Sequence, residues 1–137
     1  MTSSPPENDA SPPGVSPRLS TGAVRAFLSP EHEGWARRLG EVVRTRLEPR
    51  HHPASDDAAR AEARELLVIL GEEGLLRPIG DQDIRGGCLA REAVAWASPL
   101  ADAVWALQGL GVTPLLLFGT EEQQSRWVEP ALAGRVM

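Results

Sequence analysis

Lysine and tyrosine are absent from this chain of 137 residues, and cysteine occurs once. All 14 basic residues are arginine, and 19 acidic residues bring the formal net charge to -5. This balance argues against the basic surface by which proteins bind nucleic acid. Cys88 has no second cysteine with which to form an internal disulfide, so nothing in the sequence indicates an oxidising compartment. We expect a cytoplasmic protein.

The amino terminus lacks a basic stretch followed by an apolar one, so we expect no secretory signal. Residues 100–118 are long and apolar enough to suggest a membrane span. Polar residues, glycines and a proline interrupt them, namely Asp102, Gln108, Gly109, Gly111 and Pro114. A helix of a water-soluble domain therefore explains this segment better than a membrane span.

The first residues, Met1 to Gly22, are rich in proline and serine and contain few large apolar side chains. Such a segment buries too little surface to offset the entropy lost on ordering. We therefore predict a disordered tail at residues 1–28 and one helical domain at residues 29–137. A role for the tail as a linker or docking segment is the alternative.

Apolar residues recur at helical spacing in the domain, and cap residues divide it into about five helices. The predicted fold is an all-α orthogonal or up-down bundle without a sheet. The predicted helices run from Ser29-Pro30 to Pro49, from Ser55 to Gly71, from Cys88 to Ala97, from Ser98-Pro99 to Phe118, and onward from Thr120.

Glycines and prolines mark the expected connections. Pro78 and Gly80 predict a loop, and Gly86-Gly87 predicts a turn; neither GxGxxG nor a P-loop surrounds that pair, so it is no phosphate cradle. Gly119 is expected to end the fourth helix with a positive φ. Thr120 and Gln123 have the spacing of a capping box that begins the fifth helix.

The apolar stripes place Trp35, Leu66, Leu70 and Trp105 in the core. The third helix should turn Leu89, Ala93, Trp96 and Ala97 inward. Cys88 has no histidine near it in sequence, so a buried structural cysteine is a better interpretation than a catalytic thiol.

The histidines do not form a metal site by their spacing. His51 and His52 are adjacent and lack a third and fourth ligand, and His32 stands alone, so we expect all three to be solvated. Glu72, Glu73, Glu121 and Glu122 lie at predicted helix ends, where capping and solvation explain them. We therefore assign no catalytic residue and no metal ligand.

The fourth helix is apolar on nearly every side, so the sequence predicts that other elements surround it. Gly109 and Gly111 remove side chains from its middle, which would admit either a neighbouring helix or the chain of a ligand. Pro114 is expected to kink it.

Several motifs together resemble the amino-terminal helical domain of acyl-CoA dehydrogenases, over roughly residues 31–137. The helix junction Gly119-Thr120-Glu121-Glu122-Gln123-Gln124 carries the resemblance, with Trp127, Pro130 and Ala133-Gly134 after it. Upstream, residues 70–76 (LGEEGLL) and Gly86-Gly87 resemble the first helical hairpin of the family and the loop after it. The segment from Gly80 to Gly87 is shorter than in the family.

The resemblance implies an FAD-dependent oxidoreductase of fatty acid metabolism that oxidises CH–CH bonds of acyl thioesters. In this family the fourth helix lines the acyl chain, which makes Ala103, Ala106, Leu107 and Leu110 the matching wall positions. The flavin and the catalytic base are held by a β-domain and a carboxy-terminal bundle, so no cofactor-binding residue is assigned here. The expected partners are an acyl-CoA or acyl-carrier thioester, an electron acceptor such as an electron-transfer flavoprotein, and further copies of the complete enzyme.

Two alternatives remain open at this stage. A dehydrogenase of carrier-bound acyl groups or a flavin monooxygenase would use the same scaffold. A non-catalytic helical interaction protein would need neither flavin nor base. We expect the sequence to be one part of a longer enzyme, and expect that part alone to be inactive.

Overall fold

The computed structural model describes residue 19, residues 21–47, residue 50 and residues 52–137. These residues form helices and contain no strand, which confirms the predicted all-α class. Five helices have seven residues or more, as predicted: α1 (Pro30–Val42), α2 (Asp56–Glu72), α4 (Ile84–Ala97), α5 (Pro99–Phe118) and α6 (Glu121–Leu132). The shorter elements are the 3-10 helix η1 (Gly22–Phe27), the π-helical turn η2 (Val43–Leu47) and α3 (Arg77–Gly80).

Polar side chains begin the helices at the predicted positions. Ser55 and Ser98 each accept a hydrogen bond from the amide three residues later, at the starts of α2 and α5. Thr120 accepts from the Gln123 amide, and the Gln123 side chain accepts from the Thr120 amide at 2.9 Å. The predicted capping box is therefore confirmed. These bonds satisfy amides that have no partner within the helix.

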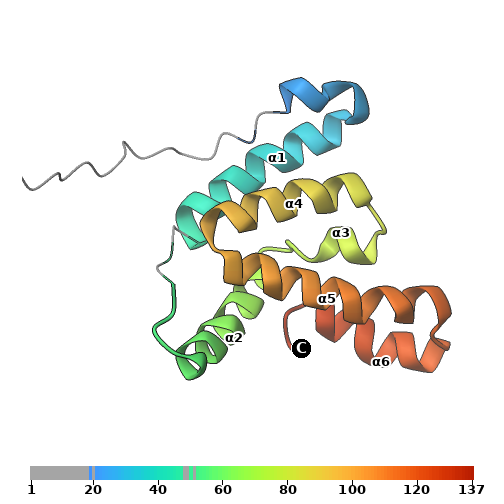
Figure 1. Ribbon diagram of the computed structural model, residues 1–137. Helices are drawn as coiled ribbons and strands as arrows, with labels where there is room; N and C mark the ends of the chain where they lie inside the picture. The colour runs from blue at the N-terminus through green and yellow to red at the C-terminus, as the bar shows by residue number, and fades with distance from the viewer. Residues whose placement is uncertain (1–18, 20, 48–49, 51) are drawn as a thin grey trace, which may run out of the picture.

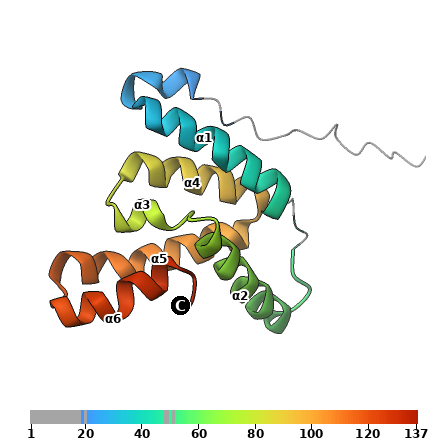
Figure 2. The ribbon, with the colours of Figure 1, turned by 180° about the vertical axis from the view of Figure 1, so that it is seen from behind.

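The helices pack around α5. Figures 1 and 2 show α1 beside α4 and α4 beside α5, while α2 crosses α5 near the amino-terminal end of α5. α5 and α6 lie side by side and run in opposite directions, joined by a short corner at Gly119. Because α5 contacts α2, α3, α4 and α6, it connects the two halves of the domain.

Buried apolar side chains from α1 to α6 form one core. Leu66, Leu70 and Trp105 are buried in it, as predicted. Trp35 is only partly buried against this core, and its indole N–H donates to the Gly86 carbonyl at 3.1 Å. The largest fully buried side chains are Leu39, Val43, Leu47, Leu66, Leu70, Leu75, Leu76 and Val94.

The loop predicted at Pro78 and Gly80 is the short helix α3, so that prediction is wrong. Proline is tolerated in the first turn of a helix, where its missing amide would have no helical partner. Pro78 and Ile79 are buried by this turn. Burial of two apolar side chains therefore explains why the segment folds back on the core instead of looping out.

The predicted turn at Gly86-Gly87 is also wrong, because α4 begins at Ile84 and not at Cys88. Asp83 caps the helix and accepts a hydrogen bond from the Gly86 amide at 3.0 Å. Both glycines are buried within the first turns of α4. A cap residue five positions ahead of the predicted start thus determined where the helix begins.

The positive φ predicted at Gly119 is not found. Its φ is -71° and its ψ is 150°, so the backbone leaves α5 in an extended conformation. Left-handed glycines occur instead at Gly74 and Gly134, with φ of 68° and 70°. α5 is continuous through Pro114.

Most of the predicted tail, residues 1–18 and 20, lies outside the described residues. The end of that segment differs from the prediction, because Gly22–Phe27 forms η1 and Leu19 and Leu28 pack against the core. The Arg85 side chain donates to the Phe27 carbonyl at 3.0 Å, which holds the end of η1 over the start of α4. The folded part therefore begins before residue 29.

The prediction that other elements surround α5 is wrong for this chain. Leu107, Leu110 and Phe118 are exposed along it. Among the described residues α5 is the helix long and apolar enough to cross a membrane by length and composition, a test that core helices of soluble proteins also pass. Its contacts with four other helices show how the rest of its surface is covered.

Candidate functional site

The four predicted wall residues lie together along one side of α5, which we call the outer strip (Ala103, Ala106, Leu107 and Leu110). Ala106 is partly buried and the other three are exposed, with Leu107 at 57% and Leu110 at 71% of full accessibility. At 3.6 residues per turn, Ala103, Leu107 and Leu110 fall within about 60° of one another and span about 10 Å. The outer strip is thus a continuous apolar surface.

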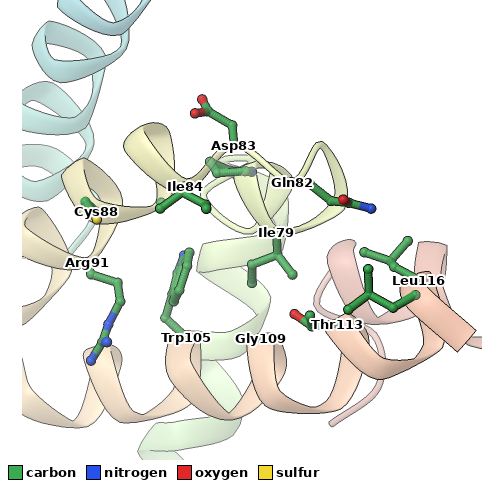
Figure 3. A pocket seen from close by; sticks show the side chains of 13 residues that line it. Ile79, Gln82, Asp83, Ile84, Cys88, Arg91, Trp105, Gly109, Thr113 and Leu116 are labelled. Carbon is green, nitrogen blue, oxygen red and sulfur yellow. The ribbon is translucent and has the colours of Figure 1, made fainter. Parts of the chain in front are cut away.

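A second apolar surface of α5 borders a cleft of about 440 Å³ between α5, α3 and the start of α4 (Figure 3). Trp105, Gly109, Thr113 and Leu116 line it from α5, at intervals of one helical turn. Ile79 of α3 and Gly87, Cys88 and Arg91 of α4 line it from the other side. No outer-strip residue lines this cleft. Leu117, which also lines the cleft, lies two turns beyond Leu110 on the same side of α5, so the two apolar surfaces adjoin.

Two glycines keep the cleft open. A Cβ atom at Gly109 would lie 3.8 Å from Cδ1 of Ile79, and one at Gly87 would lie 3.3 Å from the Trp105 ring. Larger side chains at these positions would occupy the cleft. The sequence therefore indicated that Gly109 could admit a ligand chain. It did not indicate that α3 and α4 would form the opposite wall.

Polar contacts fix the walls of the cleft. The Trp105 indole N–H donates to the Leu75 carbonyl at 2.8 Å, so the ring is held in one orientation. The Arg91 side chain donates from Nε and Nη2 to the two carboxylate oxygens of Asp102, at 2.8 and 2.7 Å. The hydrogen bond to Asp102 and its negative charge raise the pKa of the Arg91 guanidinium. This pair ties α4 to α5 at one end of the cleft.

Cys88 is exposed, so the prediction of a buried structural cysteine is wrong. Gly86, Ala90 and Ala93 form the core-facing side of α4, and Cys88 points away from them at 100° per residue. Trp96 is also 42% exposed, which corrects its predicted inward position, whereas Leu89, Ala93 and Ala97 are buried as predicted. Cys88 instead lines the cleft.

His32 is buried at the start of α1, so the prediction that it is solvated is wrong. Its Nδ1 accepts a hydrogen bond from the Ser29 amide at 3.0 Å, and its Nε2–H therefore donates to both Asp83 carboxylate oxygens at 3.1 Å. Ser29, His32 and Asp83 have the composition of a hydrolytic triad. The Ser29 hydroxyl lies 2.8 Å from His32 Nδ1 and donates to Glu31 Oε2 at 3.0 Å, but neither Ser29 nor His32 lines the cleft. The group acts as a double helix cap.

Gln108 is a polar residue that the sequence marked only as an interruption of an apolar helix. Its side chain is buried and donates to the Ala131 carbonyl at 3.0 Å and to the Val136 carbonyl at 2.7 Å. It thus connects the middle of α5 to the segment after α6. A single amide inside an apolar helix was the signal available, since buried amides require partners.

No group of three or more side chains suited to a metal ion occurs in the part of the chain that the structure describes. His52 is exposed, and His51 lies outside the described residues. Glu72 and Glu73 pair with Arg46 at 3.0 and 2.7 Å. Glu121 and Glu122 occupy the first turn of α6.

The family model of the acyl-CoA dehydrogenase N-terminal domain matches residues 29–135. The match begins at the cap of α1 and ends after α6, and so covers α1 to α6. The chain belongs to the acyl-CoA dehydrogenase family. A comparison with curated proteins gave no match.

The outer strip and the cleft are thus two apolar surfaces of α5 that the domain leaves exposed. The paired glycines do not fit a flavin-phosphate site. Gly86 and Gly87, the paired glycines that could have formed a phosphate cradle, are buried within α4, and the Gly86 amide is already bonded to Asp83. FAD, which the family uses, therefore needs residues other than these.

Proposed function

We propose that this chain is the helical wall of an FAD-dependent acyl-CoA dehydrogenase-like enzyme, in which the outer strip contacts the acyl chain of a thioester substrate. The observation that carries the proposal is the exposure of Leu107 and Leu110 on a helix whose opposite side is the core of the domain. Contiguous apolar surface that remains exposed on a folded domain usually marks a binding site. Membership in the family supports an acyl chain as the occupant.

In the proposed enzyme, substrate binding and the oxidation itself depend on different residues. Oxidation of a saturated acyl thioester requires a base for the α proton, and bound FAD supplies the acceptor for the β hydride. The outer strip contributes binding and exclusion of water, because each apolar side chain of the wall replaces solvent along the acyl chain. The base and the flavin contacts belong to other residues of the enzyme.

The test is a chain-length series in the complete flavoenzyme. Ala106→Trp or Leu110→Trp should lower kcat/KM more for long acyl chains than for short ones, by about fourfold for each methylene that loses its contact, since a buried methylene contributes about 0.8 kcal/mol. Steady-state rates with thioesters of increasing length measure this. Ala61→Trp, at an exposed position of α2, is the matched control. It should leave the ratio of kcat/KM between long and short acyl chains unchanged.

An equal loss of kcat/KM at every chain length would show that the outer strip only packs against other protein. The isolated chain is expected neither to retain FAD nor to reduce an electron acceptor with acyl-CoA. Turnover by the chain alone would overturn the division between wall and catalytic parts.

A dehydrogenase of carrier-bound acyl groups, or a flavin monooxygenase, is the second candidate on the same scaffold. The outer strip serves either, because it contacts only an apolar chain. Parallel assays with acyl-CoA and with the same acyl group on a carrier protein distinguish an acyl-CoA dehydrogenase from a dehydrogenase of carrier-bound groups. Incorporation of oxygen into the product would identify a monooxygenase. A helical interaction protein would show none of these activities.

A further inference from the structure

We propose that the cleft between α3, α4 and α5 is a second binding site, which holds one aliphatic chain with an oxygen-bearing head group at Arg91. No residue of the outer strip lines this site, although Leu117 of its lining lies two turns beyond Leu110 on the same side of α5. The proposal does not depend on the outer strip contacting substrate.

The length and volume of the cleft fit a single extended chain. Trp105 and Leu116, at the two ends of its α5 side, are eleven residues apart, or about 16 Å along the helix axis. A volume of about 440 Å³ spread over that length gives a section several times smaller than that of a helix, which is about 10–12 Å wide. A single flexible chain therefore fits the cleft.

The lining is suited to an aliphatic ligand. Ile79, Trp105 and Leu116 supply apolar contact, and the glycines at positions 87 and 109 let a chain approach the backbone of α4 and α5. Binding pockets for small molecules typically have volumes of about 300–1,000 Å³ and combine such walls with a few polar groups. An engineered apolar cavity of about 150 Å³ already binds benzene, so the cleft exceeds what one ring would fill.

Arg91 is the one basic side chain of the cleft lining, which also includes the polar residues Gln82, Asp83 and Thr113. Figure 3 shows Arg91 beyond Trp105 at one end, and Thr113 and Leu116 at the other. Arg91 bonds Asp102 through Nε and Nη2, so the hydrogens of Nη1 remain for an oxygen of the ligand. Guanidinium groups bind carboxylate and carbonyl oxygens through charge-assisted hydrogen bonds. A fatty carboxylate and an acyl thioester share this chemistry of chain and oxygen.

Cys88 provides a direct measurement of occupancy in the full chain. It is the one cysteine of the sequence, it is exposed, and it lines the cleft one helical turn from Arg91. The rate at which a thiol reagent labels Cys88 is measured with hexanoate, octanoate and decanoate below their micelle concentrations. We expect these acids to slow labelling, with half-protection at a concentration about fourfold lower for each added methylene.

Three variants of α5 test whether the ligand occupies the cleft. Gly109→Leu should abolish protection, because its side chain would extend toward Ile79 and Trp105. Gly111→Leu is the matched control on the same helix, since a Cβ there meets no atom within 4 Å, and it should preserve protection. Thr113→Trp, at an exposed position, should reduce the gain from octanoate to decanoate and keep protection by hexanoate. This variant tests the site even where Gly109→Leu lowers stability.

Protection that grows with chain length in the wild type and is lost in Gly109→Leu supports the site. Decanoyl-CoA and decanoate are compared in parallel. Protection by both would show that the free acid is sufficient for binding, and protection by decanoyl-CoA alone would show that the site requires the thioester. Unchanged labelling with every ligand, or equal protection in Gly109→Leu, would overturn the proposal. Protection only by an added protein would overturn it also, and would identify the cleft as a protein-docking groove.

Discussion

Asp83 joins two helices through one carboxylate. It accepts hydrogen bonds from the Gly86 amide at the start of α4 and from His32 at the start of α1. Burial by itself would raise the pKa of Asp83, but the hydrogen bonds from Gly86 and His32 outweigh burial and hold this pKa below its usual value. The charged carboxylate is therefore the form that the folded protein favours.

Asp83→Asn should preserve both hydrogen bonds and remove the charge. Because the pKa is depressed in the folded state, the charge stabilises the fold above the ordinary aspartate pKa of about 4, and this contribution disappears as the pH falls through the folded-state pKa. The urea midpoint of the variant should lie below that of the wild type at pH 7, and the gap should close at acid pH. Asp81→Asn, at an exposed position two residues earlier, is the control and should show a smaller gap at pH 7. A gap independent of pH would refute the role of the charge.

Local hydrogen bonds and charges begin α6 at the corner between α5 and α6. Thr120 and Gln123 exchange hydrogen bonds between side chains and amides, and the Gln124 side chain donates to the Gly119 carbonyl at 3.1 Å. Glu121 and Glu122 place negative charge at the amino terminus of α6, where the helix dipole favours it. All of these interactions lie within six residues, so they were predictable from the sequence.

Thr120→Ala should destabilise the domain by about 0.5–2 kcal/mol, the usual cost of losing a helix cap. Thr120→Ser retains the hydroxyl and should restore most of that loss. Urea unfolding followed by circular dichroism measures both variants. Equal stability of the alanine and serine variants would mean that the cap contributes nothing to the folded state.

At the scale of the whole molecule, two glycines let the chain close on itself after α6. A Cβ at Gly134 would lie 2.3 Å from the Leu67 carbonyl oxygen, and one at Gly71 would lie 2.3 Å from the Ala133 carbonyl. The backbone of α2 therefore touches the segment that follows α6, with no side chain between them. Gln108 holds the same segment from α5 through the Ala131 and Val136 carbonyls.

Gly134→Ala should lower the unfolding midpoint of the entire domain, because the methyl group would collide with backbone and because φ is 70° there. We expect a loss larger than the typical 1 kcal/mol of a point substitution. Gly111→Ala is the control. Gly111 lies within a helix and a Cβ there meets no atom within 4 Å, so this variant should stabilise the protein by up to about 1 kcal/mol. Equal effects of the two variants on the midpoint would show that the close contact is unimportant.

The sequence by itself determined the helical class, the number of long helices and most of their starts. Helical periodicity and caps such as Ser55, Ser98 and Thr120 act over a few residues, so they are legible without knowledge of the fold. The core positions Leu66 and Leu70 followed for the same reason. The resemblance also indicated the family and the four positions of the outer strip, whose contact with substrate stays a prediction.

Only the tertiary structure decided which faces of these helices meet. Cys88 is exposed because the opposite side of α4 packs on the core, and His32 is buried because Asp83 approaches from 51 residues away in sequence. The cleft depends on α3, α4 and α5 being brought side by side, which no local pattern encodes. Local interactions set where helices begin and end, whereas burial of apolar surface between distant segments sets how they pack and what they leave open.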